Sequence, residues 1–216
     1  MFVVIGLTQM HQGICMSVYD LELNCYLRPI PPTVRFSADD VENLAVFSRV
    51  ELARSPERLL IKRPHTEDVA VHRVPTAVGS LLTTVEQQQF LNRIAVKSVH
   101  AVFKIDNNGP ILQHENGRYF VVPGTGSYSL GTVHAKSVKV YTNRFGKVRV
   151  DFQDNSGVSY QDLPLVSVDN INPDLMTPSL ALKANKYVRV SLARPFQPAG
   201  WPRPACFLQV SGIHGY

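Results

Sequence analysis

Residues 147–153 read Lys-Val-Arg-Val-Asp-Phe-Gln, and the alternation of apolar and polar side chains in this stretch decides the fold class. Successive side chains of a β-strand point to opposite faces, so Val148, Val150 and Phe152 share one face. The polar side chains of the stretch, basic ones among them, share the other. The stretch is therefore predicted to be a strand with one face against a core and one face in water.

Two further strand candidates of the C-terminal half, 137–142 and 187–193, repeat this pattern. Each places branched apolar side chains on one face and basic or aromatic side chains on the other. The inward residues are predicted to be Val138, Val140, Val188, Val190 and Leu192, and the outward residues Lys139, Tyr141, Tyr187 and Arg189.

Most of the remaining chain also alternates with period two. One helix is predicted over Thr83–Ala95, where no Pro or Gly interrupts a helical spacing of apolar residues, and a short one near 178–185. Many short strands with one or two helices favour a mainly β protein built as small β-barrels or a sandwich. The further predicted strands are 2–9, 14–20, 25–30, 46–52, 69–74, 99–105, 119–122, 158–161 and 206–213.

A weak internal repeat links two segments about 130 residues apart. Residues 13–20 and 146–154 both run from a Gly through alternating residues to an aromatic residue and an Asp. Each is followed by a turn and then by a strand that ends in Pro. We therefore expect a duplicated β-barrel unit, with a first barrel and connecting helix over 1–95 and a second barrel over 96–216.

The charge of the 216-residue chain is unevenly distributed. Its net charge is +5, from 22 Lys and Arg against 17 Asp and Glu. Residues 1–95 hold 9 basic and 10 acidic residues and sum to −1, whereas residues 96–216 hold 13 and 7 and sum to +6. A basic half is typical of a protein with a polyanionic partner, because Lys and Arg replace the counterions of phosphates.

Other sequence features point to a cytoplasmic location. The chain has three Cys, an odd number, so a disulfide framework is not expected, and its opening residues do not resemble a secretory leader. No apolar stretch approaches the roughly 20 residues that a membrane span requires, so no membrane insertion is expected.

The patterns that carry catalysis or bind cofactors are weak in this sequence. The run Gly124–Gly131 lacks the Lys and the spacing of a phosphate-binding loop, and it is predicted to be a loop. Asp151 and Asp154 are three apart on a strand and should point to opposite faces, so they are not expected to share a metal. The Cys and His residues show no paired ligand spacing. We therefore expect a protein that is not an enzyme and that uses no metal or cofactor.

The outward face of the three basic strands is the candidate binding site. Cations placed against phosphates, with aromatic rings under the bases, are the arrangement that binds single-stranded DNA or RNA. A solvated sheet face with extended Lys and Arg side chains is the alternative. The predicted nucleic-acid-binding residues are Lys136, Lys139, Tyr141, Arg144, Phe145, Lys147, Arg149, Lys186, Tyr187 and Arg189.

Several C-terminal motifs resemble those of the bacterial and archaeal dual OB-containing domain family. They are Ser129-Leu130-Gly131, the stretch 152–164 (Phe-Gln-Asp-Asn-Ser-Gly-Val-Ser-Tyr-Gln-Asp-Leu-Pro), 188–195 (Val-Arg-Val-Ser-Leu-Ala-Arg-Pro) and 207–213 (Phe-Leu-Gln-Val-Ser-Gly-Ile). The opening hairpin, which ends in Leu27-Arg28-Pro29, is similar too. The resemblance implies two consecutive OB-type barrels and an accessory subunit of an anti-phage defence system, with a nuclease or helicase subunit as partner protein.

A second reading is a structural subunit that binds a partner protein and does not contact nucleic acid. Such a subunit would bind its partner through its edge strands and the loop Pro195–Pro204, which holds four Pro residues around Trp201, a residue type enriched at interface hot spots. Burial of Trp201 inside its own barrel is the alternative. A third class, a small-molecule sensor or hydrolase, would rest on the Gly124–Gly131 loop alone.

Overall fold

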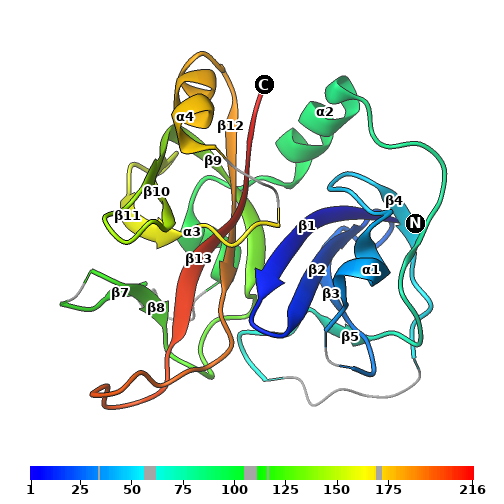
Figure 1. Cartoon of the computed structure of the whole chain (residues 1–216), viewed down its shortest axis with the longest axis horizontal. Helices are drawn as coiled ribbons and strands as arrows, with labels where there is room; N and C mark the ends of the chain where they lie inside the picture. The colour runs from blue at the N-terminus through cyan, green and yellow to red at the C-terminus, as the bar shows by residue number, and fades with distance from the viewer. Residues whose placement is uncertain (34, 56–61, 105–110, 116, 169–171) are drawn as a thin grey trace. The chain divides into compact units, whose positions relative to one another are not determined.

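The computed structural model describes the chain except for residues 34, 56–61, 105–110, 116 and 169–171 (Figure 1). As predicted, the protein is mainly β, and its strands form two curled sheets of six and seven strands. The strands are β1 Phe2–Met10, β2 Gly13–Asp20, β3 Cys25–Ile30, β4 Arg49–Glu51, β5 Asp68–Ala70, β6 Thr76–Ala77, β7 Leu112–Gln113, β8 Tyr119–Val121, β9 Leu130–Thr142, β10 Val148–Asp154, β11 Ser159–Pro164, β12 Lys186–Leu192 and β13 Cys206–Gly215. The helices are α1 Ala38–Val41, α2 Thr84–Ile94, α3 Val99–Phe103 and α4 Pro173–Ala181.

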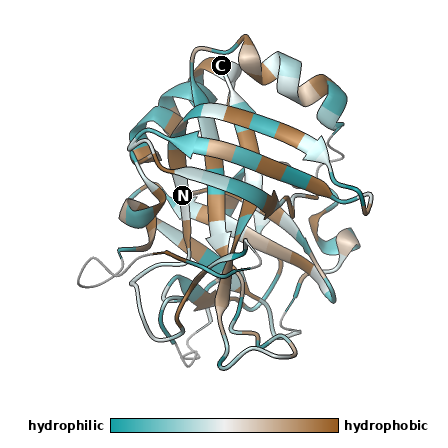
Figure 2. Ribbon diagram, turned by 90° about the vertical axis from the view of Figure 1, so that its left-hand side faces the viewer, coloured by the Kyte–Doolittle hydropathy of each residue, from teal (hydrophilic) through white to brown (hydrophobic). Residues whose placement is uncertain are grey.

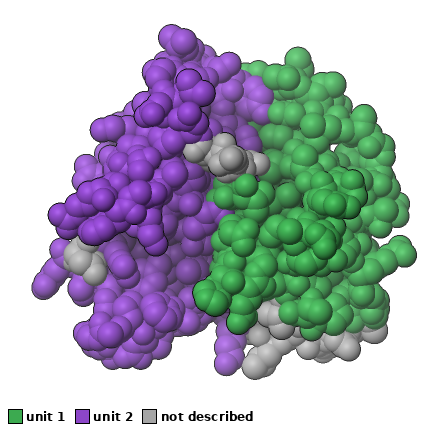
Figure 3. All heavy atoms as spheres, viewed as in Figure 1, with its two compact units in different colours: residues 1–61, 67–92, 167–169 green, residues 62–66, 93–166, 170–216 purple. Residues whose placement is uncertain are grey.

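The chain divides into two compact units, which Figure 3 distinguishes by colour. Unit 1 comprises residues 1–61, 67–92 and 167–169, and unit 2 comprises residues 62–66, 93–166 and 170–216. The main division, between residues 92 and 93, lies close to the predicted boundary after residue 95. Two short segments depart from this division. Residues 62–66 belong to unit 2, although the residues on either side of them belong to unit 1. Residues 167–169 belong to unit 1, although the residues on either side of them belong to unit 2.

Unit 1 contains the six-stranded sheet, with the order β5-β3-β2-β1-β4-β6. Strands β1, β2 and β3 form an antiparallel meander, β4 pairs with β1 antiparallel, and β5 pairs with β3 in parallel. An isolated antiparallel bridge between Arg54 and Val71 links the segment after β4 to the segment after β5. Apolar side chains such as Val4, Met16 and Phe36 fill the core of this unit.

Unit 2 contains the seven-stranded sheet, with the order β11-β10-β9-β12-β13-β8-β7. Strands β9, β10 and β11 form a meander, β12 pairs with β9 antiparallel, and a parallel bridge between Leu165 and Val210 joins the end of β11 to β13. Helix α4 is held to β9 because Thr177 Oγ1 donates to the carbonyl of Val140 and accepts from its amide, each at 2.8 Å. Figure 2 shows the alternation of hydrophobic and hydrophilic residues along the strands.

The two units share one connectivity. In each, three antiparallel strands are followed by a helix, the fourth strand pairs with the first, and the fifth runs parallel to the third. The two copies of the internal repeat lie at the second strand of each unit, β2 and β10. Each of these strands ends in a buried Asp that accepts backbone hydrogen bonds from the following turn: Asp20 from Glu22 and Leu23, and Asp154 from Ser156 and Val158.

The predicted helix over Thr83–Ala95 is confirmed as α2, while its role as a connector between barrels stays a prediction. The strand expected over 99–105 is wrong, because residues 99–103 form helix α3 and residue 105 lies outside the described residues. Ser98 caps this helix by accepting from the Ala101 amide, and its apolar side chains have the spacing of a helix face as well as of a strand. Helix α4 begins at Pro173, earlier than expected, because Asn172 caps it and Pro fits the first helical position.

None of the helices in the described part of the chain is long and apolar enough to cross a membrane.

Candidate nucleic-acid interface

The ten residues predicted to bind nucleic acid differ in their exposure. Some lie at the surface, some are half-buried and two are buried, so they do not form the single solvent-facing stripe that the alternation predicted. The exposed residues are Lys136, Lys139, Arg144, Phe145 and Lys147; the half-buried ones are Tyr141, Arg149 and Lys186; the buried ones are Tyr187 and Arg189.

The prediction that Tyr187 and Arg189 face solvent is wrong, since only 0% and 2% of their surfaces are exposed. Strand β12 lies between β9 and β13, and both of its faces are covered. The Arg189 guanidinium lies against Gly212, where an added Cβ would overlap it, and Nη2 donates to the Ser211 carbonyl at 2.6 Å. Alternation predicts that two faces differ in composition, but it does not reveal that the more polar face is also buried.

Lys136 and Lys186 lie at the margin of the predicted site. Lys186 opens β12, and its Nζ donates to the carbonyl of Lys183 at 2.6 Å, which ties the ammonium group to the chain just after α4. Lys136 is exposed on β9. Neither residue lines the cleft described below.

The outward face of β9, β10 and β11 carries two carboxylates among its cations. Tyr141 pairs with Arg149 across β9 and β10, and its hydroxyl donates to Oδ1 of Asp151 at 3.1 Å and to Oδ1 of Asp162 at 3.3 Å. The Lys139 ammonium lies 5.5 Å from the centre of the Tyr141 ring. Burial, together with the hydrogen bond from Tyr141 to Asp151 and the charges of both carboxylates, raises the pKa of Tyr141 to about 12. Tyr141 is therefore a neutral hydrogen-bond donor at physiological pH, and the face is a mixed-charge network.

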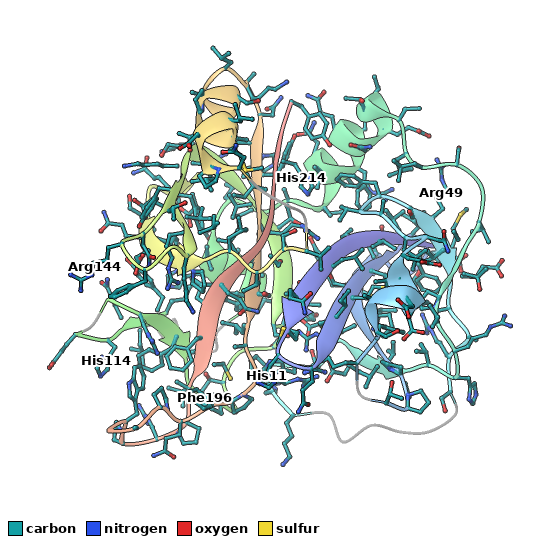
Figure 4. The ribbon with its side chains drawn as sticks, in the orientation of Figure 1. His11, Arg49, His114, Arg144, Phe196 and His214 are labelled. Atoms are coloured by element: carbon teal, nitrogen blue, oxygen red, sulfur yellow. The ribbon has the colours of Figure 1, made fainter. Side chains whose placement is uncertain are left out.

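The turn between β9 and β10 presents an exposed cation next to an exposed ring. Asn143 Oδ1 accepts from the amides of Phe145 and Lys147, both at 3.0 Å, and Gly146 takes the positive φ that completes the turn. The Phe145 side chain is 70% exposed, and the Arg144 guanidinium lies 4.8 Å from its ring centre. Arg144 projects from the tip of this hairpin, away from the rest of the unit (Figure 4). A fixed turn thus holds an aromatic surface and a positive charge in water.

Beside this turn, unit 2 has a cleft of about 530 Å³. Its walls come from the β9–β10 turn, from β10 and β11, from the β7–β8 hairpin and from the start of β13. The described lining residues combine two guanidinium groups, three aromatic rings, two side-chain amides and one carboxylate. The lining residues are Gly117, Arg118, Tyr119, Asn143, Phe145, Arg149, Gln161, Asp162, Leu163, Pro164, Phe207 and Leu208.

The cleft also contains candidate site residues that the sequence patterns did not predict, above all Arg118 and Asp162. The Arg118 guanidinium lies 5.6 Å from the ring centre of Phe207. Asp162 adopts a positive φ of 53° next to an irregularity in the pairing of β10 with β11. Alternation does not find such residues, because Arg118 belongs to a short hairpin and Asp162 to an irregular strand. The only signal for Arg118 was its position beside Gly117 in a predicted turn.

Trp201 is half-buried in the loop between β12 and β13. Its ring stacks on His114 with 4.1 Å between ring centres, and it packs in T-shaped arrangements with Phe120 and Phe207, with 5.3 Å and 5.0 Å between ring centres. Part of its surface thus serves packing within unit 2. Its predicted role in binding a partner protein stays a prediction.

The other sequence motifs considered for catalysis or metal binding do not form a site in the described part of the chain. Residues 124 and 126 of the Gly-rich run adopt positive φ, and the predicted loop is confirmed over 124–129, whereas Leu130 and Gly131 already belong to strand β9. Asp154 is buried and Asp151 lies on the outward face, so they do not share a site. Across the residues that the structure describes, no three or more His, Cys, Asp or Glu side chains are grouped to hold a metal ion.

Comparison with known proteins does not extend this description: no family model, no curated protein and no solved structure matches the chain.

Proposed function

We propose that unit 2 is an OB-type barrel that binds single-stranded nucleic acid in the cleft beside the β9–β10 turn. The observation that carries the proposal is the position of this cleft relative to the strand order. OB folds are five-stranded Greek-key barrels that bind oligonucleotides on the face of strands two and three and at the loops joining strands one to two and four to five.

The connectivity of unit 2 supports this assignment. Its five long strands pair in the order β9-β10-β11-β13-β12-β9, with the parallel Leu165–Val210 bridge between the third and fifth and helix α4 between the third and fourth. The cleft is lined by the first hairpin turn, by the second and third strands and by the start of the fifth strand. This position supports the proposal, because OB barrels take their ligands on the second and third strands and at the loop that joins the first strand to the second.

The chemistry of the cleft fits a single strand. Arg118 and Arg149 can neutralise phosphates, and the rings of Phe145 and Phe207 offer faces on which unpaired bases stack. The net charge of +6 on residues 96–216 attracts a polyanion to this half of the chain. Because bases in a duplex are already stacked on each other, exposed rings favour single strands over double strands.

We propose the same barrel type for unit 1, whose strands follow the same order with α1 after the third strand. Residues 1–95 sum to −1, so this unit is not proposed to bind the polyanion. The role as a non-enzymatic accessory subunit of an anti-phage defence system, beside a nuclease or helicase, rests on the family resemblance alone.

The test is fluorescence anisotropy with labelled single-stranded and double-stranded DNA and RNA over a salt series. We expect single strands to bind more tightly than duplexes. About five phosphate contacts would give a slope of log K against log salt of about −3.5. Equal binding of duplex and single strand, or a slope near zero, would contradict the proposal.

The partner-protein role has one observation in its favour. Phe196 is 61% exposed in the loop that also carries Trp201, so this loop presents an apolar ring to solvent. Co-purification of a stoichiometric partner that survives nuclease treatment, and its loss in Phe196→Ala, would support that role. The same experiment with no partner recovered would count against it.

A further inference from the structure

Among the described residues that line the cleft, Asp162 is the one carboxylate, beside two guanidinium groups, three aromatic rings and two side-chain amides. Its side chain is 64% exposed and lines the cleft together with Arg149 and Phe145. A carboxylate there repels phosphates, so its position is unfavourable to a site that recognises only a phosphate backbone. The parts of a nucleotide that it can attract are those that carry hydrogen-bond donors, which are base edges in DNA and, in RNA, the ribose 2′-hydroxyl as well.

Neighbouring groups hold this carboxylate in place. The Asp162 amide donates to Oδ1 of Asp151 at 2.8 Å, and the Tyr141 hydroxyl donates to Oδ1 of Asp162 at 3.3 Å. Arg149 Nε lies 3.6 Å from the same oxygen and offsets its negative charge. In the described part of the chain, no residue donates a hydrogen bond to Oδ2, and the Tyr141 hydroxyl occupies one of the two lone pairs of Oδ1. Each oxygen therefore has a lone pair that can accept from a ligand.

The four bases differ in what they offer to a carboxylate. An ionised carboxylate only accepts hydrogen bonds, through two oxygens side by side. Guanine has two adjacent donors, N1–H and the 2-amino group, on its Watson–Crick edge. Adenine and cytosine each place an acceptor nitrogen beside their amino group, and uracil and thymine place N3–H between two carbonyls. Only guanine can satisfy both oxygens without bringing an acceptor against them.

We propose that the cleft selects guanine, with Asp162 accepting from N1–H and the 2-amino group while the base stacks on an aromatic wall. The inference rests on the proposed function and adds base specificity to it. Unpaired bases are commonly recognised in this way, by stacking on aromatic side chains and by hydrogen bonds to the Watson–Crick edge. Asp162 would act as a specificity residue, and the Arg side chains would supply most of the affinity.

The experiment compares oligonucleotides that differ at one base. Oligothymidylates of about twelve nucleotides, within the site size of one OB fold, carry thymine, adenine, cytosine or guanine at the centre, and anisotropy gives each Kd. We expect the oligonucleotide with one guanine to bind about tenfold more tightly than the others. Inosine, which lacks the 2-amino group, and 2-aminopurine, which lacks N1–H, should each lose most of this gain.

Two isosteric variants separate the role of Asp162 from a general effect of charge. Asp162→Asn should abolish the preference for guanine and bind plain oligothymidylate more tightly than the wild type, because a negative charge leaves the cleft. A gain in binding also shows that the variant is folded. Asp151→Asn removes a charge from the same network but keeps an acceptor for the Asp162 amide, and it should retain the preference.

The outcomes are distinguishable. Tight binding of all single strands with no base preference would overturn the guanine inference and leave the proposed function standing. Binding of no single strand, even at low salt, would overturn the proposed function as well. A guanine preference that survives in Asp162→Asn would overturn the assignment to Asp162.

Discussion

Arg149 and Asp162 face each other across β10 and β11, with 3.6 Å between Nε and Oδ1. The Arg side chain is 21% exposed and the Asp side chain 64% exposed, and both line the cleft. An ion pair with an exposed partner contributes about 0–1 kcal/mol to stability. Its importance therefore lies in binding, where the cation and the carboxylate attract different parts of a nucleotide.

The first prediction concerns the cations of the β9–β10 hairpin. Replacing Lys147 and Arg149 together by Ala should weaken binding of single strands and make the salt slope shallower by about one or more, because fewer counterions are released. Anisotropy over the salt series measures this slope. The matched control removes two exposed cations elsewhere, Arg73 and Lys97, and should leave the slope nearly unchanged. A double variant Lys147→Ala, Arg149→Ala with the wild-type slope would exclude this hairpin from the interface.

The second prediction concerns stacking on Phe145. Phe145→Ala should weaken binding by about 1–3 kcal/mol, the range for loss of one stacked base. Because the ring is exposed, thermal stability should change little. Tyr128→Ala is the control, since Tyr128 is also an exposed ring with a cation nearby, Lys104 Nζ at 5.1 Å, but lies outside the cleft. Equal losses in both variants would indicate that exposed rings contribute without regard to position.

The third prediction concerns the two equivalent aspartates. Oδ1 of Asp154 accepts from the amides of Ser156 and Val158, and Oδ2 accepts from the amide of Val99 at 3.2 Å. Asp154→Ala leaves these donors without their acceptor and should lower the free energy of unfolding by about 2–4 kcal/mol. Hydrogen exchange should locate the loss in unit 2.

Asp20→Ala is the counterpart of that variant in unit 1. Asp20 accepts from two backbone amides and from Arg54 Nη2 at 2.9 Å, so its loss should raise exchange rates in unit 1. Glu115→Ala, at an exposed position, should change stability by less than about 0.5 kcal/mol. If each Asp variant raised exchange rates equally in both units, the prediction that each turn stabilises its own unit would be wrong.

The fourth prediction concerns pH. Burial, with a smaller effect of the Arg189 charge, lowers the pKa of His214 to about 3. The unfolded chain, with its His pKa near 6.5, binds a proton that the folded state does not bind. Stability therefore falls as pH decreases from about 6.5 toward 3, by up to about 1.4 kcal/mol per pH unit. Chemical denaturation at several pH values should show this slope, and His214→Gln should flatten it; an equally steep slope in the variant would assign it to other groups.

Much of the fold was predictable from local patterns. The strands β1, β2, β3, β10 and β13 and the helix α2 lie where alternation or helical spacing placed them, because burial on one face imposes its period on the sequence. The segment of α3 was predicted wrongly. Val99, Ala101 and Phe103 have the alternation of a strand, whereas Val99, Val102 and Phe103 have the spacing of a helix face. Over so short a length both patterns are met, and the cap at Ser98 decided for the helix.

The candidate site was predictable only in part. Exposed cations and a ring at the β9–β10 hairpin follow from sequence, since the hairpin is a local structure with its own turn signals. The burial of Tyr187 and Arg189 does not, because it depends on the strands paired on either side of β12 and on the cover over its second face.

The local order of residues thus determined that this chain is a β protein with a repeated hairpin and a basic second half. Tertiary pairing alone decided that Arg118, Asp162 and Phe207, far apart along the chain, line one cleft. The physical reason is the separation along the chain over which each kind of interaction acts. Periodicity and turn chemistry act between residues close in sequence, whereas a cleft is made where distant strands meet, and no local signal records that meeting.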